Sequence, residues 1–298
     1  MRQIRKPKDL AGAVFSLCIG QVQDSGLLAR LQGSSGAVVD AVERYDEAAK
    51  AGALYCLVPT PNIGKVTAVE MEAVYRDRMA KKVGPGRPVY DRIMAIPDRG
   101  QCPLCAQRTV STLDHHLPKK KFPALAVAPT NLVAACSECN KVKLARHPTT
   151  PDEQTLHPYF DTVEGSARWL FASVDETTPP AVRFVVSPPT NWLPALQARA
   201  VKHFEVFELA KLYGSHAAQE MCQIQYQLAV VYGVGGKEAV REHLRVAASS
   251  RNKAHANSWQ AATYEALRDS TWFCDGGFQR VLVEDLPEDG AAQPAGGV

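Results

Sequence analysis

The stretch CPLCAQRTVSTLDHHLPKKKFPALAVAPTNLVAACSECN, residues 102–140, decides the fold of this chain. It begins and ends with a Cys-x-x-Cys pair, formed by Cys102 and Cys105 and by Cys136 and Cys139. Each pair has the short loop that lets two thiolates reach one ion, and four thiolates complete a tetrahedral zinc shell. One such pair is a weak signal because redox motifs share it, whereas two in one short segment are a strong signal. The sequence therefore predicts a zinc site that joins the two ends of the stretch.

A dense polar run, Asp114–His116, lies between the two cysteine pairs. Residues 107–112 before it are typical of one arm of a β-hairpin, and residues 113–117 are expected to form the second strand. Alternation along a strand places Asp114 and His115 on opposite faces unless the backbone bulges or bends there. The pattern thus predicts a small sheet that carries both side chains.

Helical patterns follow this sheet and surround it. The latter half of residues 131–145 is expected to be a helix, with Asn140 and Lys143 on its first turns. Apolar residues recur at three- and four-residue steps between residues 8 and 55 and again after Thr67, which indicates amphipathic helices. Further elements are expected as a strand over residues 181–186, a helix from Leu193, and helices near residues 216–233, 237–250 and 257–270.

The fold class expected from these patterns is α+β, with a zinc-stabilised module embedded in a mainly α-helical chain. Gly- and Pro-rich breaks, such as Val83 to Pro88 (VGPGRP), separate the segments. Four parts are expected: a helical N-terminal flank over residues 1–98, the module over 99–150, a mainly helical region over 151–280, and a disordered acidic tail over 281–298.

The composition is that of a chain with a packed core. Of its 298 residues, 46% are apolar and 22% are charged. We find no run of eighteen apolar residues, and the N-terminus is a poor fit to a signal peptide, so no membrane span is expected. The four cysteines outside the pairs have apolar or aromatic neighbours and are expected to be buried free thiols, rather than disulfides, in a reducing, cytoplasmic setting. These are Cys18, Cys56, Cys222 and Cys274.

Positive charge is concentrated in the cysteine segment, although the formal net charge of the chain is only +3. Residues 99–147 hold eight Lys and Arg against two acids, so the remainder of the chain is slightly acidic. Positive charge around a metal motif indicates a polyanionic substrate. A solvated lysine run explains Lys119–Lys121 equally well, but it explains the whole segment less well.

The order of residues in this segment resembles that of the HNH endonucleases, whose nuclease core is the ββα-metal fold. The resemblance covers residues 101–143, and it implies a treble-clef-like module with metal-dependent cleavage of phosphodiester bonds. At the last signature position Asn140 stands in place of the more usual histidine, and members with Asn there resemble this chain and bind a divalent ion. The matching residues are Asp114, His115, Pro118, Asn131, Leu132, Cys136, Cys139, Asn140 and Lys143.

The resemblance also implies roles for the polar residues. His115 would be the general base, because its ordinary pKa of about 6.5 suits deprotonation of water. Asp114 and Asn140 would supply hard oxygen ligands to one catalytic Mg²⁺ or Mn²⁺. The four cysteines would hold zinc for structure alone, because a closed thiolate shell leaves no open position.

Other residues have roles with open alternatives. By analogy with the family, Asn131 would orient the His115 ring, although it could instead cap the element that follows it. Lys119, Lys121 and Lys143 would contact phosphates of the nucleic acid. His116 has several open hypotheses: the role given to His115, if the strand is registered differently; a third metal ligand; a packed side chain; or a side chain that faces phosphate.

A weaker resemblance concerns the flanking regions. Overall length, the LDH-x-LPK segment and several aromatic patches are similar to HNH nucleases encoded beside an ATPase in bacterial anti-phage systems of the Septu type. It implies a partner ATPase that controls an effector nuclease acting on DNA, RNA or both. The alternative hypotheses are a catalytically inactive zinc-stabilised adaptor that binds nucleic acid, and a protein whose main role is assembly.

Overall fold

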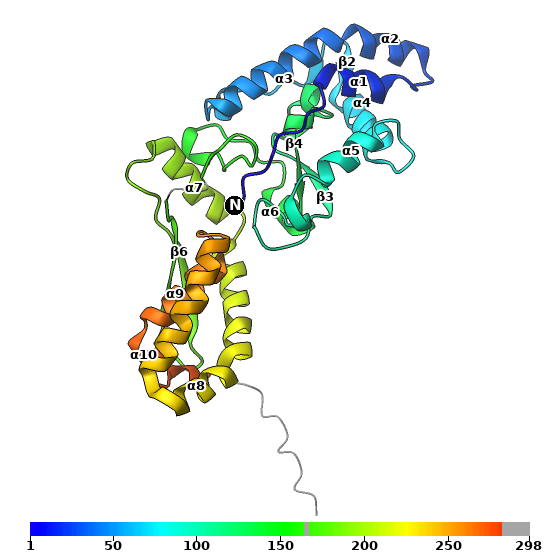
Figure 1. Cartoon of the computed structure of the whole chain (residues 1–298). Helices are drawn as coiled ribbons and strands as arrows, with labels where there is room; N and C mark the ends of the chain where they lie inside the picture. Colours follow the sequence, from blue (N-terminus) through cyan, green and yellow to red (C-terminus); the bar gives the residue numbers. More distant parts are fainter. Residues whose placement is uncertain (164–166, 282–298) are drawn as a thin grey trace, which may run out of the picture. The chain divides into compact units, whose positions relative to one another are not determined.

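The computed structural model describes residues 1–163 and 167–281 of the chain, which form two compact units (Figure 1). Unit 1 comprises Met1–Ala167 and Pro188–Leu209, and unit 2 comprises Arg168–Ser187 and Ala210–Val298. The acidic tail expected over residues 281–298 lies, from residue 282 onward, outside the described residues. Unit 1 therefore contains the whole cysteine segment.

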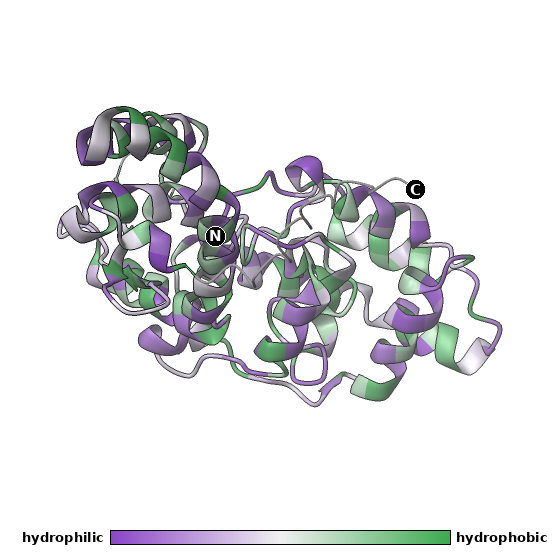
Figure 2. Ribbon diagram, turned by 90° about the horizontal axis from the view of Figure 1, so that it is seen from below, coloured by the Kyte–Doolittle hydropathy of each residue, from purple (hydrophilic) through white to green (hydrophobic). Residues whose placement is uncertain are grey.

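Unit 1 begins with amphipathic helices, as the residue pattern predicted. The Asp24 side chain caps the second of them by accepting the Leu27 N–H at 2.9 Å, and Thr67 and Glu70 form a capping box for the fourth. Green and purple residues alternate along the helices in Figure 2, consistent with one buried face. The elements are α1 (Ala11–Ile19), α2 (Ser25–Gly33), α3 (Ser35–Lys50), α4 (Ala68–Ala73), a π-helix (Val74–Ala80) and α5 (Arg87–Met94).

The cysteine segment contains a two-stranded antiparallel sheet followed by a short helix. Strand β3 (Thr112–His115) pairs with β4 (Leu132–Ala135), and helix α6 (Ser137–Lys143) follows β4 directly. The helix confirms the expectation for residues 131–145. All four residues of β4 are buried, so this apolar run provides the inner edge against which β3 is held.

The expected hairpin between residues 107–112 and 113–117 is wrong. Residues 107–111 follow a turn at Ala106, whose φ is 52°, and they contribute only an isolated bridge between Gln101 and Thr109. The turn returns the chain so that the Cys102 N–H donates to the Arg108 carbonyl at 2.7 Å. The partner of β3 comes instead from beyond the long 116–131 connection.

That connection is a packed loop of 3₁₀ turns at Pro123–Leu125 and Pro129–Asn131. Its apolar side chains face α3, where they form a buried cluster with Val42 and Tyr45. The loop residues in this cluster are Leu117, Phe122, Leu125 and Ala128. Because its side chains are buried, the loop is a rigid wall beside β3.

Unit 1 is completed by helix α7 (Pro194–Val206), which is joined to the cysteine segment by polar contacts. The His203 Nε2–H donates to the Leu104 carbonyl at 2.7 Å. Arg199 forms a buried ion pair with Asp161 at 2.8 Å. These bonds hold α7 beside the first cysteine pair.

Unit 2 is a β-hairpin covered by helices. Strand β5 (Leu170–Asp175) pairs with β6 (Ala181–Val186), which confirms the strand expected over residues 181–186 and supplies the partner that the sequence did not predict. The Asn257 side chain accepts the backbone N–H groups of Trp169 and Leu170 at 2.8 and 3.2 Å. The helices are α8 (Leu209–Ala254), with a break at Gly235–Gly236, α9 (Trp259–Asp269) and α10 (Thr271–Cys274).

Among the described residues, no helix combines the length and the apolar character that crossing a membrane requires.

Candidate functional site

Four buried cysteines lie together in unit 1 and could hold a zinc ion. All pairs of their Sγ atoms lie within 4.8 Å of one another. Zinc with Zn–S bonds of about 2.3 Å in a tetrahedron requires sulfur separations near 3.8 Å, so the cluster fits the ion with a small contraction. The residues are Cys102, Cys105, Cys136 and Cys139, and this set is named the cysteine cluster below.

Local backbone geometry forms the cysteine cluster. The Arg108 N–H donates to Cys105 Sγ at 3.4 Å, and the Cys139 N–H donates to Cys136 Sγ at the same distance, where Cys136 caps α6. Hydrogen bonds among the crowded thiols lower the pKa of Cys105 and raise the pKa of Cys136 and Cys139. The cluster therefore links the turn before β3 to the start of α6.

A cavity of ≈ 350 Å³ opens beside the end of β3, and we name it the His115 cavity. It brings together three residues that the sequence assigned to one catalytic centre, Asp114, His115 and Asn140. Asp114 and His115 are successive paired residues of β3, and both line the cavity although strand alternation favours opposite faces. Its remaining lining includes Tyr75, Pro118, Lys119, Lys120, Leu144 and Ala145.

The His115 imidazole has a defined tautomer. Its Nε2 lies 2.8 Å from the Ala126 carbonyl oxygen, which can only accept, so Nε2 carries a hydrogen. Burial lowers the pKa of His115 to about 3, which keeps the ring neutral at pH 7. The Nδ1 atom consequently holds a lone pair, although a pKa this far below 7 makes the ring a weaker base than a free imidazole.

Asp114 is buried beside Lys143. The Lys143 ammonium lies 3.0 Å from Asp114 Oδ2 and 3.2 Å from Oδ1, and it also donates to the His115 carbonyl at 2.6 Å. Only the contact to Oδ1 has hydrogen-bond geometry, so Oδ2 is a buried oxygen with no hydrogen-bond partner among the described residues. Burial raises the pKa of Asp114, and the charge of Lys143 opposes that rise.

Asp114 Oδ2 lies 3.0 Å from the Lys143 ammonium, so a divalent cation held by Asp114 and Asn140 would displace part of this ion pair. Carboxylate and amide oxygens are the donor types that hard divalent cations take. The chemistry of the donors is therefore suitable for Mg²⁺ or Mn²⁺.

The expected role of Lys143 as a phosphate contact is wrong for this arrangement. Its side chain is buried, and its ammonium group is used by Asp114 and by the His115 carbonyl. Lys143 instead joins α6 to the end of β3, and its charge opposes the rise in the pKa of Asp114 that burial causes.

Asn131 also contacts different groups from those expected. Its Oδ1 accepts the Leu117 N–H at 2.7 Å, and its Nδ2 donates to the carbonyls of Leu117 and Leu125 at 3.0 and 3.2 Å. These bonds use the Nδ2 hydrogens on the loop backbone, so Asn131 would orient the His115 ring through the loop and not by a bond of its own. The ring is oriented by Ala126, which lies in the loop that Asn131 holds.

The lysine run has more than one environment. Lys119 lines the His115 cavity, with its ammonium 5.4 Å from the centre of the Tyr75 ring. Lys121 is exposed and lies 3.0 Å from His147 Nδ1. Both ammonium groups lie at the edges of cavities, as phosphate contacts require.

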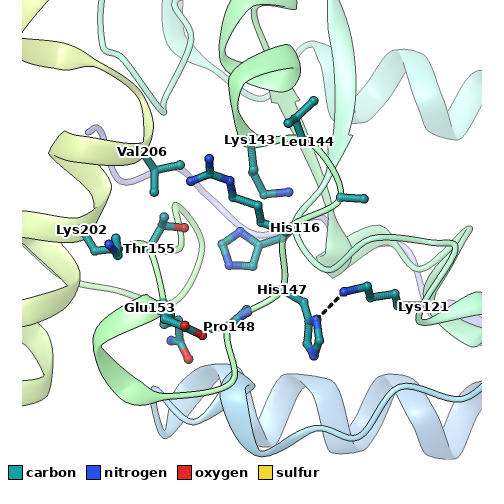
Figure 3. A pocket seen from close by; sticks show the side chains of 13 residues that line it. His116, Lys121, Lys143, Leu144, His147, Pro148, Glu153, Thr155, Lys202 and Val206 are labelled. Atoms are coloured by element: carbon teal, nitrogen blue, oxygen red, sulfur yellow. Dashed lines mark hydrogen bonds between the residues drawn. The ribbon is translucent and has the colours of Figure 1, made fainter.

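A second cavity of ≈ 470 Å³ lies on the other side of residues 143–145, and we name it the His116 cavity. Figure 3 shows the His116 ring between Thr155 and Lys202 on one side and His147 and Lys121 on the other. The His116 ring also packs on His157, with 4.1 Å between ring centres.

The hypothesis that His116 is a third metal ligand stays a prediction. Within residues 1–163 and 167–281, His116 belongs to no group of three or more side chains able to hold a metal. Its environment favours two of the other hypotheses, a packed side chain or one that faces a phosphate-bearing ligand.

Comparison with known proteins found one relative with significant similarity in sequence. The chain is 26% identical over 229 residues to protein ea31 of Escherichia phage lambda, an alignment that spans 72% of this chain and 76% of that protein. No protein-family model matches the chain. No solved structure matches it either.

Proposed function

We propose that the chain is a metal-dependent endonuclease of the HNH type, with β3, β4 and α6 as its ββα-metal core. The observation that carries the proposal is the His115 cavity, where a neutral imidazole with a free Nδ1 lone pair lies beside Asp114 and Asn140. The order strand, strand, helix, with zinc ligands at both ends, supports the same interpretation.

The residues divide the chemistry of phosphodiester hydrolysis between them. His115 Nδ1 takes the proton from the attacking water, while its Nε2–H stays on the Ala126 carbonyl and fixes the ring. Asp114 and Asn140 would hold one Mg²⁺ or Mn²⁺, which when bound supplies positive charge to the phosphate and the leaving 3′ oxygen. Lys119 and Lys121 contact neighbouring phosphates and position the strand without reading its sequence.

The proposed substrate is nucleic acid, and the proposed role is that of an effector in anti-phage defence under the control of a partner ATPase. The basic segment over residues 99–147 supports the first statement. The resemblance to nucleases encoded beside an ATPase supports the second. Unit 2 offers an apolar row on α8, where the exposed Tyr226, Val230 and Val234 recur at four-residue steps.

The Asp114–Lys143 ion pair favours a second candidate, an inactive zinc-stabilised adaptor that binds nucleic acid. In this arrangement a lysine lies where a divalent cation would be held. An active enzyme requires Lys143 to yield part of this contact when the cation binds.

Cleavage of plasmid DNA and of RNA with Mg²⁺ or Mn²⁺ distinguishes the two candidates. We expect cleavage by the wild-type protein and a loss of about 10²- to 10⁴-fold in His115→Ala, the range that a general base contributes. His243→Ala, on α8 of unit 2, is the matched control and should cleave at the wild-type rate. Binding without cleavage would establish the adaptor, and an unchanged rate in His115→Ala would remove His115 from the chemistry.

A further inference from the structure

The His116 cavity has polar atoms without hydrogen-bond partners in its wall. Gln154 is 1% exposed and lines the cavity, and neither its Oε1 nor its Nε2 has a hydrogen-bond partner among residues 1–163 and 167–281. The buried Nδ1 of His116 also lacks one. Buried polar groups are normally satisfied, so three such atoms on residues that line one cavity indicate partners that the chain itself does not provide, which these side chains would reach by turning toward the cavity.

Positive charge surrounds the same cavity. Lys121, Arg146 and Lys202 line it, and the single acid in the lining is Glu153. The Glu153 carboxylate already accepts hydrogen bonds from the N–H and the hydroxyl of Thr149, each at 2.7 Å. The cavity therefore combines cationic side chains with polar atoms that can bond a neutral group.

This combination matches the two halves of a nucleotide. An amide side chain presents one acceptor and two donors, which is the complement of a nucleobase edge. Lysine and arginine side chains bind phosphate. The volume of ≈ 470 Å³ lies within the range of about 300–1,000 Å³ that is usual for small-ligand sites.

The position of the cavity connects it with the proposed cleavage centre. Leu144 and Ala145 line both the His115 cavity and the His116 cavity. A strand with a phosphate in the first cavity can therefore place a neighbouring nucleotide in the second.

We propose that the His116 cavity binds one nucleotide of the strand that is cleaved, with the base edge at Gln154 and His116 and a phosphate at Lys121, Arg146 and Lys202. This inference rests on the proposed nuclease function, and it adds a site that selects the nucleotide beside the scissile bond. The selection would appear as a preference for one base next to the cut.

Gln154→Met tests the site because it separates binding from folding. Methionine has nearly the same volume as glutamine and removes both unpartnered amide atoms, so the thermal unfolding midpoint should stay constant or rise. Affinity for a labelled single-stranded 12-mer of mixed sequence, measured by fluorescence anisotropy without Mg²⁺, should fall about tenfold. Lys202→Gln should lower the affinity for the 12-mer by a smaller factor. The matched controls are Gln21→Met and Lys50→Gln, at exposed positions on other parts of unit 1.

Binding of the four deoxynucleoside 5′-monophosphates and of inorganic phosphate, measured by calorimetry, separates the possible ligands. A Gln154-dependent affinity for the 12-mer supports the proposal. Gln154-dependent binding of free monophosphates alone would overturn it in favour of a free nucleotide as ligand. Equal affinity of phosphate and monophosphates, or no effect of Gln154→Met on either probe, would also overturn it.

The cleavage assay keeps this inference distinct from the proposed function. If the wild-type protein binds the 12-mer through Gln154 and cuts nothing, the nuclease function fails and the nucleotide site stands. If it cuts with an identical base preference and rate in Gln154→Met, the nucleotide site fails and the nuclease function stands.

Discussion

The cysteine cluster and the His115 cavity share helix α6 but use it in opposite ways: the cluster joins the start of α6 to the turn before β3, and the cavity is lined by residues of β3 and α6. The cluster offers four identical sulfur atoms that are buried and within 4.8 Å of one another, so a bound ion would have its whole shell from the protein. The His115 cavity offers unlike groups, among them an Asp114 oxygen with no hydrogen-bond partner in the described residues. A complete ligand shell is typical of a structural metal site, whereas a catalytic metal site keeps a position open for water or substrate. Separate substitutions should therefore affect the fold and the reaction independently.

Loss of a cluster ligand is expected to have the largest effect. Cys136→Ser removes a proposed zinc ligand but keeps a side-chain acceptor at the N-cap of α6, so its effect reports on the metal, and structural zinc contributes about 10–16 kcal/mol of binding free energy in small zinc domains. We expect loss of bound zinc, measured by elemental analysis, and loss of the cooperative thermal transition of unit 1. Cys222→Ser, at an exposed free thiol in unit 2, is the control and should retain both. Absence of tightly bound zinc in the wild-type protein would contradict the assignment.

Breaking the Asp114–Lys143 pair should have the next largest effect. Lys143→Met leaves Asp114 buried without its counterion, which destabilises folded proteins by about 3–5 kcal/mol, as urea unfolding would measure. The loss of stability should be smaller at pH 5 than at pH 8. Burial already raises the pKa of Asp114, and its protonation at the lower pH removes the unpaired charge. The Asp114→Asn, Lys143→Met double variant should regain most of the stability.

An exposed pair provides the comparison. Arg245→Met breaks the contact with Glu242 on α8, and it should cost about 1 kcal/mol or less. Equal losses of unfolding free energy in Lys143→Met and Arg245→Met would show that the buried pair stabilises the fold no more than the exposed pair does.

Acid should weaken unit 1 through histidines that lie outside both metal sites. Burial lowers the pKa of His157 and His203 to about 3, below the ordinary value of about 6.5. The unfolded chain therefore binds more protons between these values, so stability is fully present above pH 6.5 and declines as the pH falls toward 3. Urea midpoints of zinc-saturated protein at pH 7 and pH 5 should differ less in His203→Gln than in the wild type. The same pH dependence in His203→Gln and in a His243→Gln control would reject this cause.

Phosphate contacts should give the smallest effect. Lys119→Gln and Lys121→Gln should each reduce the slope of log binding constant against log salt by about 0.7–0.9, as expected for one lost contact. Fluorescence anisotropy with a labelled duplex or single strand measures that slope, and Lys50→Gln is the control. Unchanged slopes would place the nucleic acid elsewhere on the surface.

The cysteine cluster and the helix after it could be predicted because their signals are local. The spacing within each Cys-x-x-Cys pair and the residues of α6 are contiguous, and the structure confirms both as a cluster and a helix. The partner of β3 could not be predicted in this way, because it follows a packed loop of sixteen residues, 116–131. The local pattern predicted a nearby hairpin, whereas in the structure β3 pairs with the buried apolar strand β4.

The contacts that each polar side chain makes could not be predicted from local sequence patterns either. A lysine three residues after Asn140 resembles a phosphate contact, and only the packing of α6 on β3 shows that Lys143 is buried against Asp114. Ala126 and Gln154 carry no sequence signal of their own. Ala126 acts through a backbone atom, and Gln154 acts through the absence of partners in the described residues.

The bond between His115 and Ala126 has a consequence for mutational scanning. A carbonyl oxygen is present whatever residue occupies position 126, so replacing the side chain there leaves the acceptor in place. The backbone conformation of the loop therefore determines which nitrogen of His115 carries the hydrogen. Substitution of the side chain at position 126 would not reveal this role. Changes that move the loop backbone would reveal it, such as substitution of Asn131 or an insertion or deletion in the loop.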